Sequence, residues 1–230
     1  MNLLALETTE MAGTVAALAG DRLLGQLELN PHQRSAQSLA PALAELLDRV
    51  DWQPSDVDLV AVTVGPGSFT GLRVGVTTAK TFAYAAGAGV MGVDTLQVVA
   101  ATAPREVNGL WVAVDAQRGD VVAAEYRRDT SGWMSRVGEA RLVAAREWLA
   151  ELAPGSVVSG PGLKRLASRL PAGLEPLDPR FWQPTAEMVG RVALHDYEAG
   201  RRDHLWSLVP RYSRRSAAEE KWDQRLKADG

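Results

Sequence analysis

Two acidic residues stand at matching places in two similar fragments of the chain. Glu7 lies in LALETTEMAGTVAA and Asp115 in VAVDAQRGDVVAA, each between an apolar run and a polar turn. Carboxylate oxygens are the ligands that Mg²⁺ prefers, so the pair, together with Thr8, Thr9 and the guanidinium of Arg118, predicts a nucleotide or magnesium cleft if the two fragments face each other. An acidic residue at the end of a strand also serves in ordinary turns, and the sequence leaves that alternative open.

A glycine-rich turn, Gly65-Pro66-Gly67, lies between a predicted strand and a predicted helix. Backbone amides at such a turn can face an anion. The segment nevertheless lacks both the P-loop pattern and the dinucleotide-binding pattern, because Thr70 falls where the last glycine of the latter would stand. We therefore interpret Gly65 and Gly67 as parts of a structural turn that can also touch a nucleotide.

The helix predicted over residues 70–86 carries small residues at every fourth position. They are Gly71, Gly75, Ala79 and Ala83. Glycine costs up to about 1 kcal/mol relative to alanine inside a helix, so two glycines in one row indicate close packing. One alternative is that the helix packs closely against its own sheet. The other is that it meets a second helix or a second chain, through either this row or the face with Leu72, Val76 and Phe82.

Basic residues gather near the end of the chain. Arg211, Arg214 and Arg215 are flanked by Tyr212 and Trp222, and this mixture of residues can contact the backbone and bases of RNA. Acidic residues follow closely, so a solvated tail that pairs its own charges is the alternative.

Composition excludes several chemistries. The 230 residues include no cysteine and only three scattered histidines, so neither a thiol nucleophile, a cysteine-ligated metal nor a local histidine cluster can be formed. A net charge of -3 argues against a protein whose main task is to bind nucleic acid. Because we find neither a signal peptide nor an apolar run long enough to cross a membrane, we expect a cytoplasmic protein without membrane contact.

Strand and helix patterns alternate in an order that occurs twice. Strands are predicted at 3–6, 14–18, 23–29, 59–64 and 90–93, and helices at 35–50, 70–86 and 95–102. The second series has strands at 110–114, 121–126, 133–137 and 157–158, and helices at 144–152, after 162 and at 185–198. This repetition predicts an α/β fold of two duplicated βββαβα subdomains, at residues 1–104 and 105–199, with residues 200–230 able to pack back on the first. A single irregular α/β domain is the alternative.

The run GPGSFTGLRVGVTTAK resembles the hallmark of the bacterial TsaB (YeaZ) family. The resemblance extends to LALETTE, QRSAQSLAPALAELL, VAVDAQRGDVVAAEY and VPRYSRRSAAEEKW, which together span most of the chain. It implies an actin/Hsp70/sugar-kinase-like fold, in agreement with the repeated element order. Glu7, Gln117 and Val122 depart from the family pattern at the predicted cleft, which argues against direct use of ATP.

The resemblance also implies a function. Members of this family are non-catalytic partners of a TsaD-type transferase that forms threonylcarbamoyladenosine beside the tRNA anticodon, with a TsaE-type ATPase joining the complex. It therefore implies contact with tRNA through the complex and a homodimer when the chain is alone. It implies no tightly bound cofactor and no metal or catalytic residue, with ATP or ADP and magnesium held at the complex interface.

In this family the first two helices form the partner interface. Carried over to this sequence, that interface comprises Leu39, Leu43, Leu46, Leu47, Gly71, Leu72, Gly75, Val76, Ala79 and Ala83. The alternative function is a stand-alone ATP-dependent small-molecule kinase of the same fold, in which Asp115 or Glu7 would position magnesium or act as a base.

Overall fold

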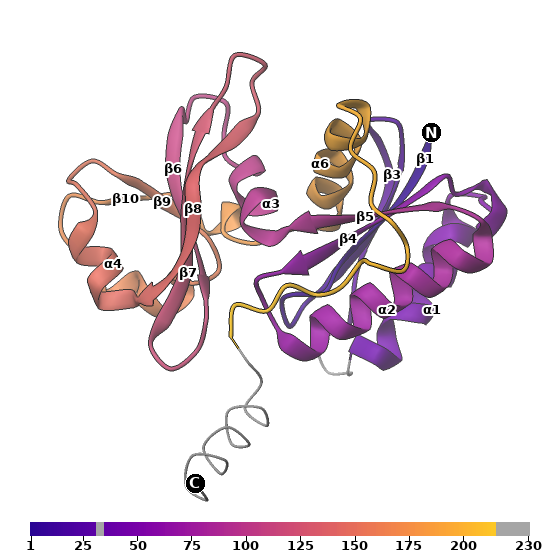
Figure 1. Cartoon of the computed structure of the whole chain (residues 1–230), viewed down its shortest axis with the longest axis horizontal. Helices are drawn as coiled ribbons and strands as arrows, with labels where there is room; N and C mark the ends of the chain where they lie inside the picture. Colours follow the sequence, from indigo (N-terminus) through magenta and orange to yellow (C-terminus); the bar gives the residue numbers. More distant parts are fainter. Residues whose placement is uncertain (31–34, 215–230) are drawn as a thin grey trace, which may run out of the picture.

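The computed structural model describes residues 1–30 and 35–214, which form two units built on separate sheets (Figure 1). The first sheet contains β1 (Asn2–Glu7), β2 (Thr14–Ala19), β3 (Arg22–Glu28), β4 (Leu59–Gly65) and β5 (Gly89–Asp94). Its strand order is β3-β2-β1-β4-β5, with β1 antiparallel to β2 and parallel to β4. The chain thus makes an antiparallel meander before it adds two parallel strands through helical crossovers.

The second sheet repeats this topology. It contains β6 (Gly109–Asp115), β7 (Asp120–Arg128), β8 (Met134–Ala144), β9 (Val157–Ser159) and β10 (Glu175–Pro176). The order is β10-β9-β6-β7-β8, so each strand occupies the place of its counterpart in the first sheet. The predicted α/β fold of two duplicated βββαβα units is confirmed.

Helices cover both faces of the first sheet. They are α1 (Ser35–Arg49) and α2 (Phe69–Ala86) on one face, and α3 (Thr95–Ala101) and α6 (Ala186–Glu198) on the other. Alternate residues of a strand point to opposite faces: Leu4 and Leu6 pack in the core with α1 and α2, whereas Leu3 and Ala5 pack in the core with α6. Because both faces are covered, β1 reads as a continuous apolar run.

Helix α6 corrects one detail of the predicted division. The sequence placed it in the second subdomain, but α6 packs on β1 and β2 of the first sheet. A Cβ at Gly190 would press on Leu18 and Leu3, so this glycine lets the helix lie close to the sheet. Helix α3 lies between the two sheets (Figure 1), where Leu96 and Val99 join the core of the second unit.

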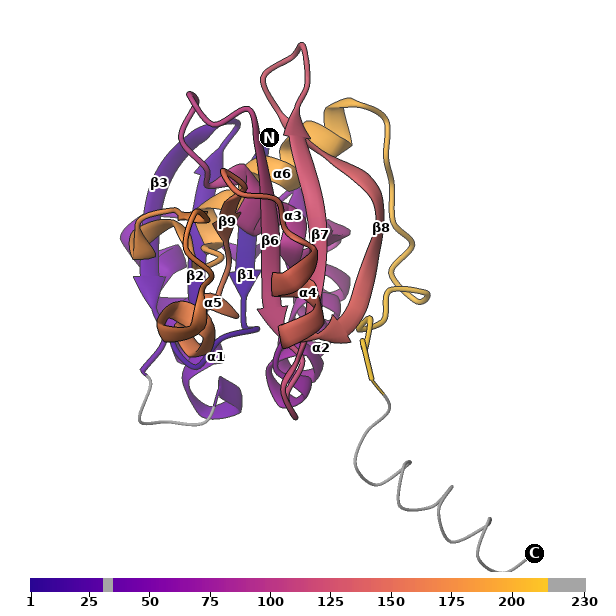
Figure 2. The ribbon, with the colours of Figure 1, turned by 90° about the vertical axis from the view of Figure 1, so that its left-hand side faces the viewer.

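The second unit has much shorter helices on its outer face (Figure 2). They are α4 (Ala145–Glu151) and α5 (Leu163–Leu166), accompanied by 3₁₀ turns at Ala167–Arg169 and Pro179–Phe181; a third such turn, Pro54–Asp56, belongs to the first unit. Trp148 of α4 and Leu163 of α5 are fully buried against the sheet, beside Ala113. The outer face of the second sheet is therefore covered by two short helices.

The chain then returns to the first unit. We call residues 201–214 the strap. Asp203 forms a β-bridge with Val90, Leu208 is buried in the first core, and the Arg211 amide donates to the Val64 carbonyl at 2.6 Å. Arg215 lies outside the described residues. No helix in the described part of the chain is long and apolar enough to cross a membrane.

Candidate functional site

Glu7 is buried at the end of β1. Its side chain has no exposed surface, and one carboxylate oxygen accepts hydrogen bonds from the Thr9 amide at 2.6 Å and from the Thr9 hydroxyl. The other oxygen has no partner among the described residues. Burial raises the pKa of Glu7 to about 7, because the charged form loses its hydration. This carboxyl group therefore lies inside the chain and does not face an open cleft.

Thr8, beside it, is covered by helix α2. Its hydroxyl donates to the Gly71 carbonyl at 2.9 Å. A Cβ at Gly71 would overlap the Thr8 carbonyl oxygen, and one at Gly75 would overlap the Thr8 hydroxyl. The two glycines are thus required for α2 to approach the end of β1. The alternative of packing against the chain's own sheet is confirmed for both glycines, and their contact with a partner stays a prediction.

The turn Gly65-Pro66-Gly67 is filled by the chain itself. A Cβ at Gly65 would overlap the Arg211 carbonyl of the strap, and one at Gly67 would overlap Thr9. Ser68 begins α2 as its N-cap, with its hydroxyl accepting from the Gly71 amide at 3.2 Å. Both glycines are therefore needed for the chain to pack at this turn, which confirms its structural role, whereas contact with a nucleotide stays a prediction.

Asp115 and Arg118 lie in the hairpin between β6 and β7. Asp115 accepts from Arg165 at 2.8 Å and from the Gln117 amide at 3.0 Å. Gln117 and Arg118 adopt positive φ angles of 62° and 54°, as a tight turn requires. No group of three or more potential metal ligands occurs among the described residues. With Glu7 buried and Asp115 paired, these residues do not fit a magnesium–nucleotide complex.

Asp115 does line a cavity of about 710 Å³ between α4 and α5. Arg146, Arg165 and Arg169 line it as well, together with Asp120. The sequence reading missed these arginines because they lie on short helices that carry no recognisable motif.

The predicted partner residues on the first two helices are buried in the chain's own core. Leu39, Leu43, Leu46, Leu47, Leu72, Val76, Ala79 and Ala83 all belong to the buried residues of the first unit. Each helix turns its large apolar side chains toward the sheet, so only Leu43 and Leu47 also reach an outward-facing surface. The predicted interface therefore stays a prediction, and the part of it that reaches the surface of the single chain is Leu43 and Leu47, in a groove between the two helices.

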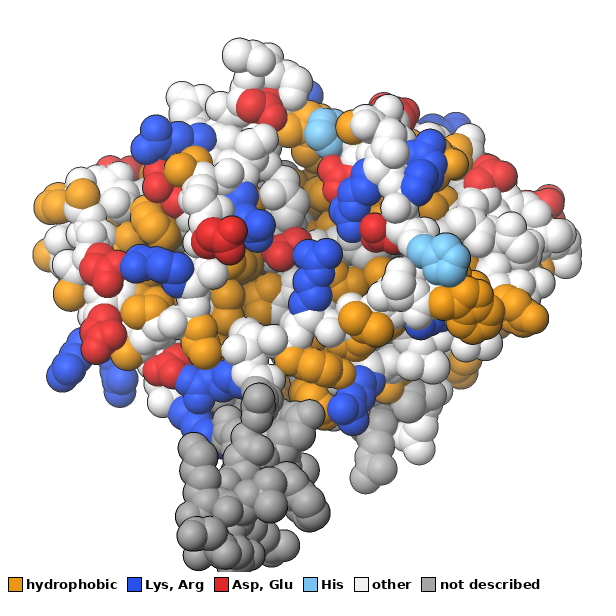
Figure 3. Space-filling view, viewed as in Figure 1, with side chains coloured by type: hydrophobic (Ala, Val, Ile, Leu, Met, Phe, Trp, Pro, Cys, Tyr) orange, Lys and Arg blue, Asp and Glu red, His pale blue; other side chains and the backbone are white. Residues whose placement is uncertain are grey.

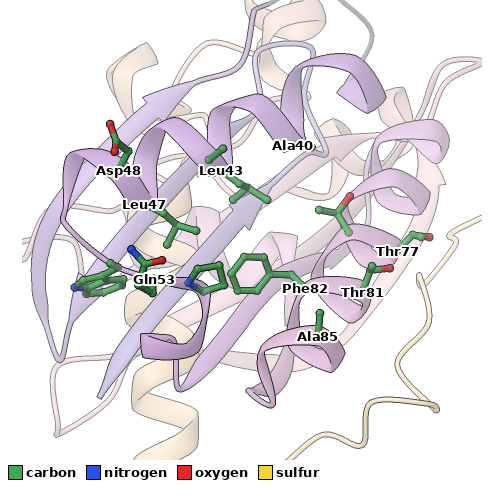
Figure 4. A pocket seen from close by; sticks show the side chains of 13 residues that line it. Ala40, Leu43, Leu47, Asp48, Gln53, Thr77, Thr81, Phe82 and Ala85 are labelled. Carbon is green, nitrogen blue, oxygen red and sulfur yellow. The ribbon is translucent and has the colours of Figure 1, made fainter.

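That surface is a groove of about 710 Å³ between α1 and α2 (Figure 4). Its walls are formed by small exposed residues, namely Ala40 and Ala44 of α1 and Thr77, Thr81 and Ala85 of α2. Leu43, Leu47, Phe82 and Trp52 form the apolar floor, and Asp48 lies at one side. A helical wheel of α2 would have identified Thr77, Thr81 and Ala85, because they lie away from the buried row of small residues on this helix.

The duplicated five-stranded sheets and their helices define a protein of the actin/Hsp70/sugar-kinase-like class. YeaZ from Pseudomonas aeruginosa superimposes with a TM-score of 0.76 at 26% identity, covering 92% of this chain and 99% of that chain. The family model of TsaD, tRNA N6-adenosine threonylcarbamoyltransferase, matches residues 29–175.

Among curated proteins, the tRNA threonylcarbamoyladenosine biosynthesis protein TsaB of Escherichia coli is 30% identical over 228 residues, 96% of this chain and 98% of that protein. TsaB of Bacillus subtilis is 31% identical over 150 residues, 65% of each chain. The chain therefore belongs to the TsaB (YeaZ) family.

Proposed function

We propose that this chain is a non-catalytic subunit that binds and stabilises a TsaD-type transferase in the threonylcarbamoylation of tRNA. The Escherichia coli relative, which aligns with 96% of this chain, is named a tRNA threonylcarbamoyladenosine biosynthesis protein. The observation that carries the proposal is the α1–α2 groove, a largely apolar exposed surface, in a protein whose glycine turn packs against Thr9 and the Arg211 backbone.

The groove suits a partner helix. Small side chains on neighbouring helices let a third helix come close, so that its larger side chains can enter the groove between α1 and α2. Leu43, Leu47 and Phe82 then supply the apolar centre of the contact, which is the part of an interface that excludes charge. The transferase is the occupant in the complex, and a second copy of this chain takes its place in a homodimer when the transferase is missing.

The remaining partners follow from the same assignment. A TsaE-type ATPase and the tRNA join through the complex, which works in the cytoplasm. The chain holds no nucleotide tightly by itself, and ATP or ADP with magnesium binds only where the transferase completes a site at the interface. The burial of Glu7 and the contacts of Thr8 and Thr9 support this division of labour.

A stand-alone kinase is less well supported. Such an enzyme needs an open phosphate loop and carboxylates free to hold magnesium. In this chain Thr9 and the strap fill the glycine turn, and Asp115 is paired with Arg165.

The docking proposal is tested with Ala44→Arg, which places a charge in the α1–α2 groove. Ala150→Arg is the matched control, because Ala150 is an exposed alanine that lines the corresponding cavity of the second unit. Burying an unpaired charge in an interface costs several kcal/mol, so we expect Ala44→Arg to weaken binding of the transferase roughly 100-fold or more. Ala150→Arg should bind like the unmodified protein. Co-purification followed by titration measures both, and normal binding by Ala44→Arg would refute the placement.

A further inference from the structure

The strap places exposed aromatic rings along one side of helix α2. The Trp206 ring centre lies 5.7 Å from that of Tyr84, and the Tyr212 ring centre lies 4.5 Å from that of Phe69. Trp206 is 67% exposed, Tyr84 69% and Tyr212 41%. Two pairs of rings, each formed by one residue of α2 and one of the strap, therefore face solvent outside the α1–α2 groove.

Cations accompany these rings. The Arg73 guanidinium lies 4.0 Å from the Phe69 ring centre and donates to the Tyr212 hydroxyl at 2.9 Å. The strap itself contains four arginines and a single acidic residue, Asp203. Figure 3 shows basic and hydrophobic side chains gathered along the course that the strap follows in Figure 1. This surface is therefore basic although the whole chain has a net charge of -3.

A polar hollow of about 450 Å³ lies beside the rings. Arg201, Arg202, Arg211 and His204 line it, together with Asp203. Arg201 is held by Asp196 and Asp203 at 2.8 Å each, whereas Arg202 and Arg211 form no ion pair with any residue that the structure describes. Arg202 donates through one Nη atom to the carbonyls of Tyr197 and Arg201, at 2.6 Å each, and lies over the Tyr197 ring. The Arg211 guanidinium and the remaining N–H groups of Arg202 can therefore meet an anion from outside.

The strap is held firmly in place. Lys80 donates to the carbonyls of Trp206 and Leu208, at 3.3 and 3.0 Å, and the Gly92 amide donates to Asp203 at 2.8 Å. At its far end Arg214 pairs with Asp120 of β7. Because the backbone is fixed before any ligand arrives, little conformational entropy is lost when one binds.

We propose that the strap and the adjoining side of α2 form a binding surface for a single-stranded segment of RNA. Bases stack on the exposed rings of Trp206 and Tyr212, while Arg202, Arg211 and Arg73 hold the phosphates. Aromatic rings beside a basic groove are the usual means of binding single strands without reading their sequence. The inference rests on the proposed function, in which the complex modifies tRNA. It also revises the predicted RNA contacts, since Arg211 stays among them whereas Arg214 is occupied by Asp120.

The test is a titration of the isolated chain with a fluorescent tRNA anticodon stem-loop at several salt concentrations. Trp206→Ala removes one stacking ring from an exposed position, and we expect binding about 5-fold weaker or more. Arg202→Gln combined with Arg211→Gln removes two phosphate contacts, which should lower the slope of log K against log salt by about 1.4. Arg146→Gln combined with Arg169→Gln is the matched control, because these exposed arginines of the second unit also form no ion pair with a described residue.

Unchanged binding by the strap variants, equal losses in the control, or no binding by the unmodified chain would each overturn the inference. The same variants are tested for binding to the transferase, which should be normal. If they lose the transferase instead, the strap is a protein interface and the RNA assignment is wrong. Failure of the RNA test alone leaves the α1–α2 groove, and thus the proposed function, intact.

Discussion

The two units share one strand order but differ in their helices and in the cavity that lies between each pair of helices. In the first unit α1 and α2 have 15 and 18 residues, whereas α4 and α5 of the second unit have 7 and 4. Each pair borders a space of about 710 Å³, but the first is lined by alanine, threonine and large apolar residues and the second by three arginines. The two sheets thus keep one topology, while only the first unit has long helices with a largely apolar groove between them.

The strand ends differ in the same way. Glu7 of β1 is fully buried, whereas Asp115, at the matching end of β6, is partly exposed and paired with Arg165. Helix α2, which forms one wall of the α1–α2 groove, also covers Thr8 at the end of β1.

Gly75→Leu should have the largest effect on this arrangement. The new side chain would collide with Thr8, and overpacking of this kind costs about 3 kcal/mol or more because the colliding atoms belong to a buried strand end. Urea unfolding measures the loss. Thr81→Leu, on the exposed side of the same helix, is the control and should leave the unfolding free energy nearly unchanged; equal losses in both variants would show that α2 does not seal the strand as described.

Glu7→Gln should change how stability depends on pH. The pKa of Glu7 is raised from 4.5 to about 7 in the folded protein, so the folded state holds a proton that the unfolded state releases. Stability therefore falls as pH rises from about 4.5 to 7, by about 3 kcal/mol in total, and falls no further above that range. Glu7→Gln removes this loss, so its stability relative to the unmodified protein should improve across this window.

The matched variant for this measurement is Asp115→Asn at the corresponding end of β6. It removes a partly exposed ion pair, which typically contributes about 1 kcal/mol or less. If the difference in unfolding free energy between Glu7→Gln and the unmodified protein stays constant from pH 4.5 to 7, Glu7 is hydrated, contrary to its burial.

Lys164→Gln should have the smallest effect. Lys164 of α5 pairs with Glu10 of the first unit at 3.0 Å, and more than half of its side chain is exposed. Such a pair contributes about 0.2 to 1 kcal/mol, and salt screens it further. Thermal unfolding at low and high salt measures the difference in stability between Lys164→Gln and the unmodified protein, and this difference should shrink as salt rises. A loss of unfolding free energy well above 1 kcal/mol would show that this contact holds the units together.

Much of the fold could be predicted because hydrophobic periodicity marks strands and helices locally. The repeated element order identified the duplication, and the strand runs lie where the structure places them. Strand β8 is longer than predicted, extending to Ala144, because most of its residues are exposed and the alternation of apolar and polar residues is lost. The position of α6 depends on contacts with Leu18 and Leu3, which no local pattern reveals.

The candidate site was harder to predict for a related reason. Periodicity shows that Leu39, Leu46 and Val76 lie on apolar helix faces, but it does not show whether a sheet or a partner covers them. The structure shows that the chain's own sheet does. The outward faces carry alanine and threonine, residue types that draw little attention in a sequence. Likewise, the exposed position of Trp206 beside Tyr84 arises only when the strap returns to α2.

The central claim is that this chain acts as a required subunit without catalysing the transfer. Its most direct test is reconstitution of tRNA threonylcarbamoylation from the transferase and the ATPase, with this chain added, omitted, or added as Ala44→Arg. We predict full modification with the unmodified chain and with Ala150→Arg, and little or none without the chain or with Ala44→Arg. Normal modification in the absence of this chain would contradict the account.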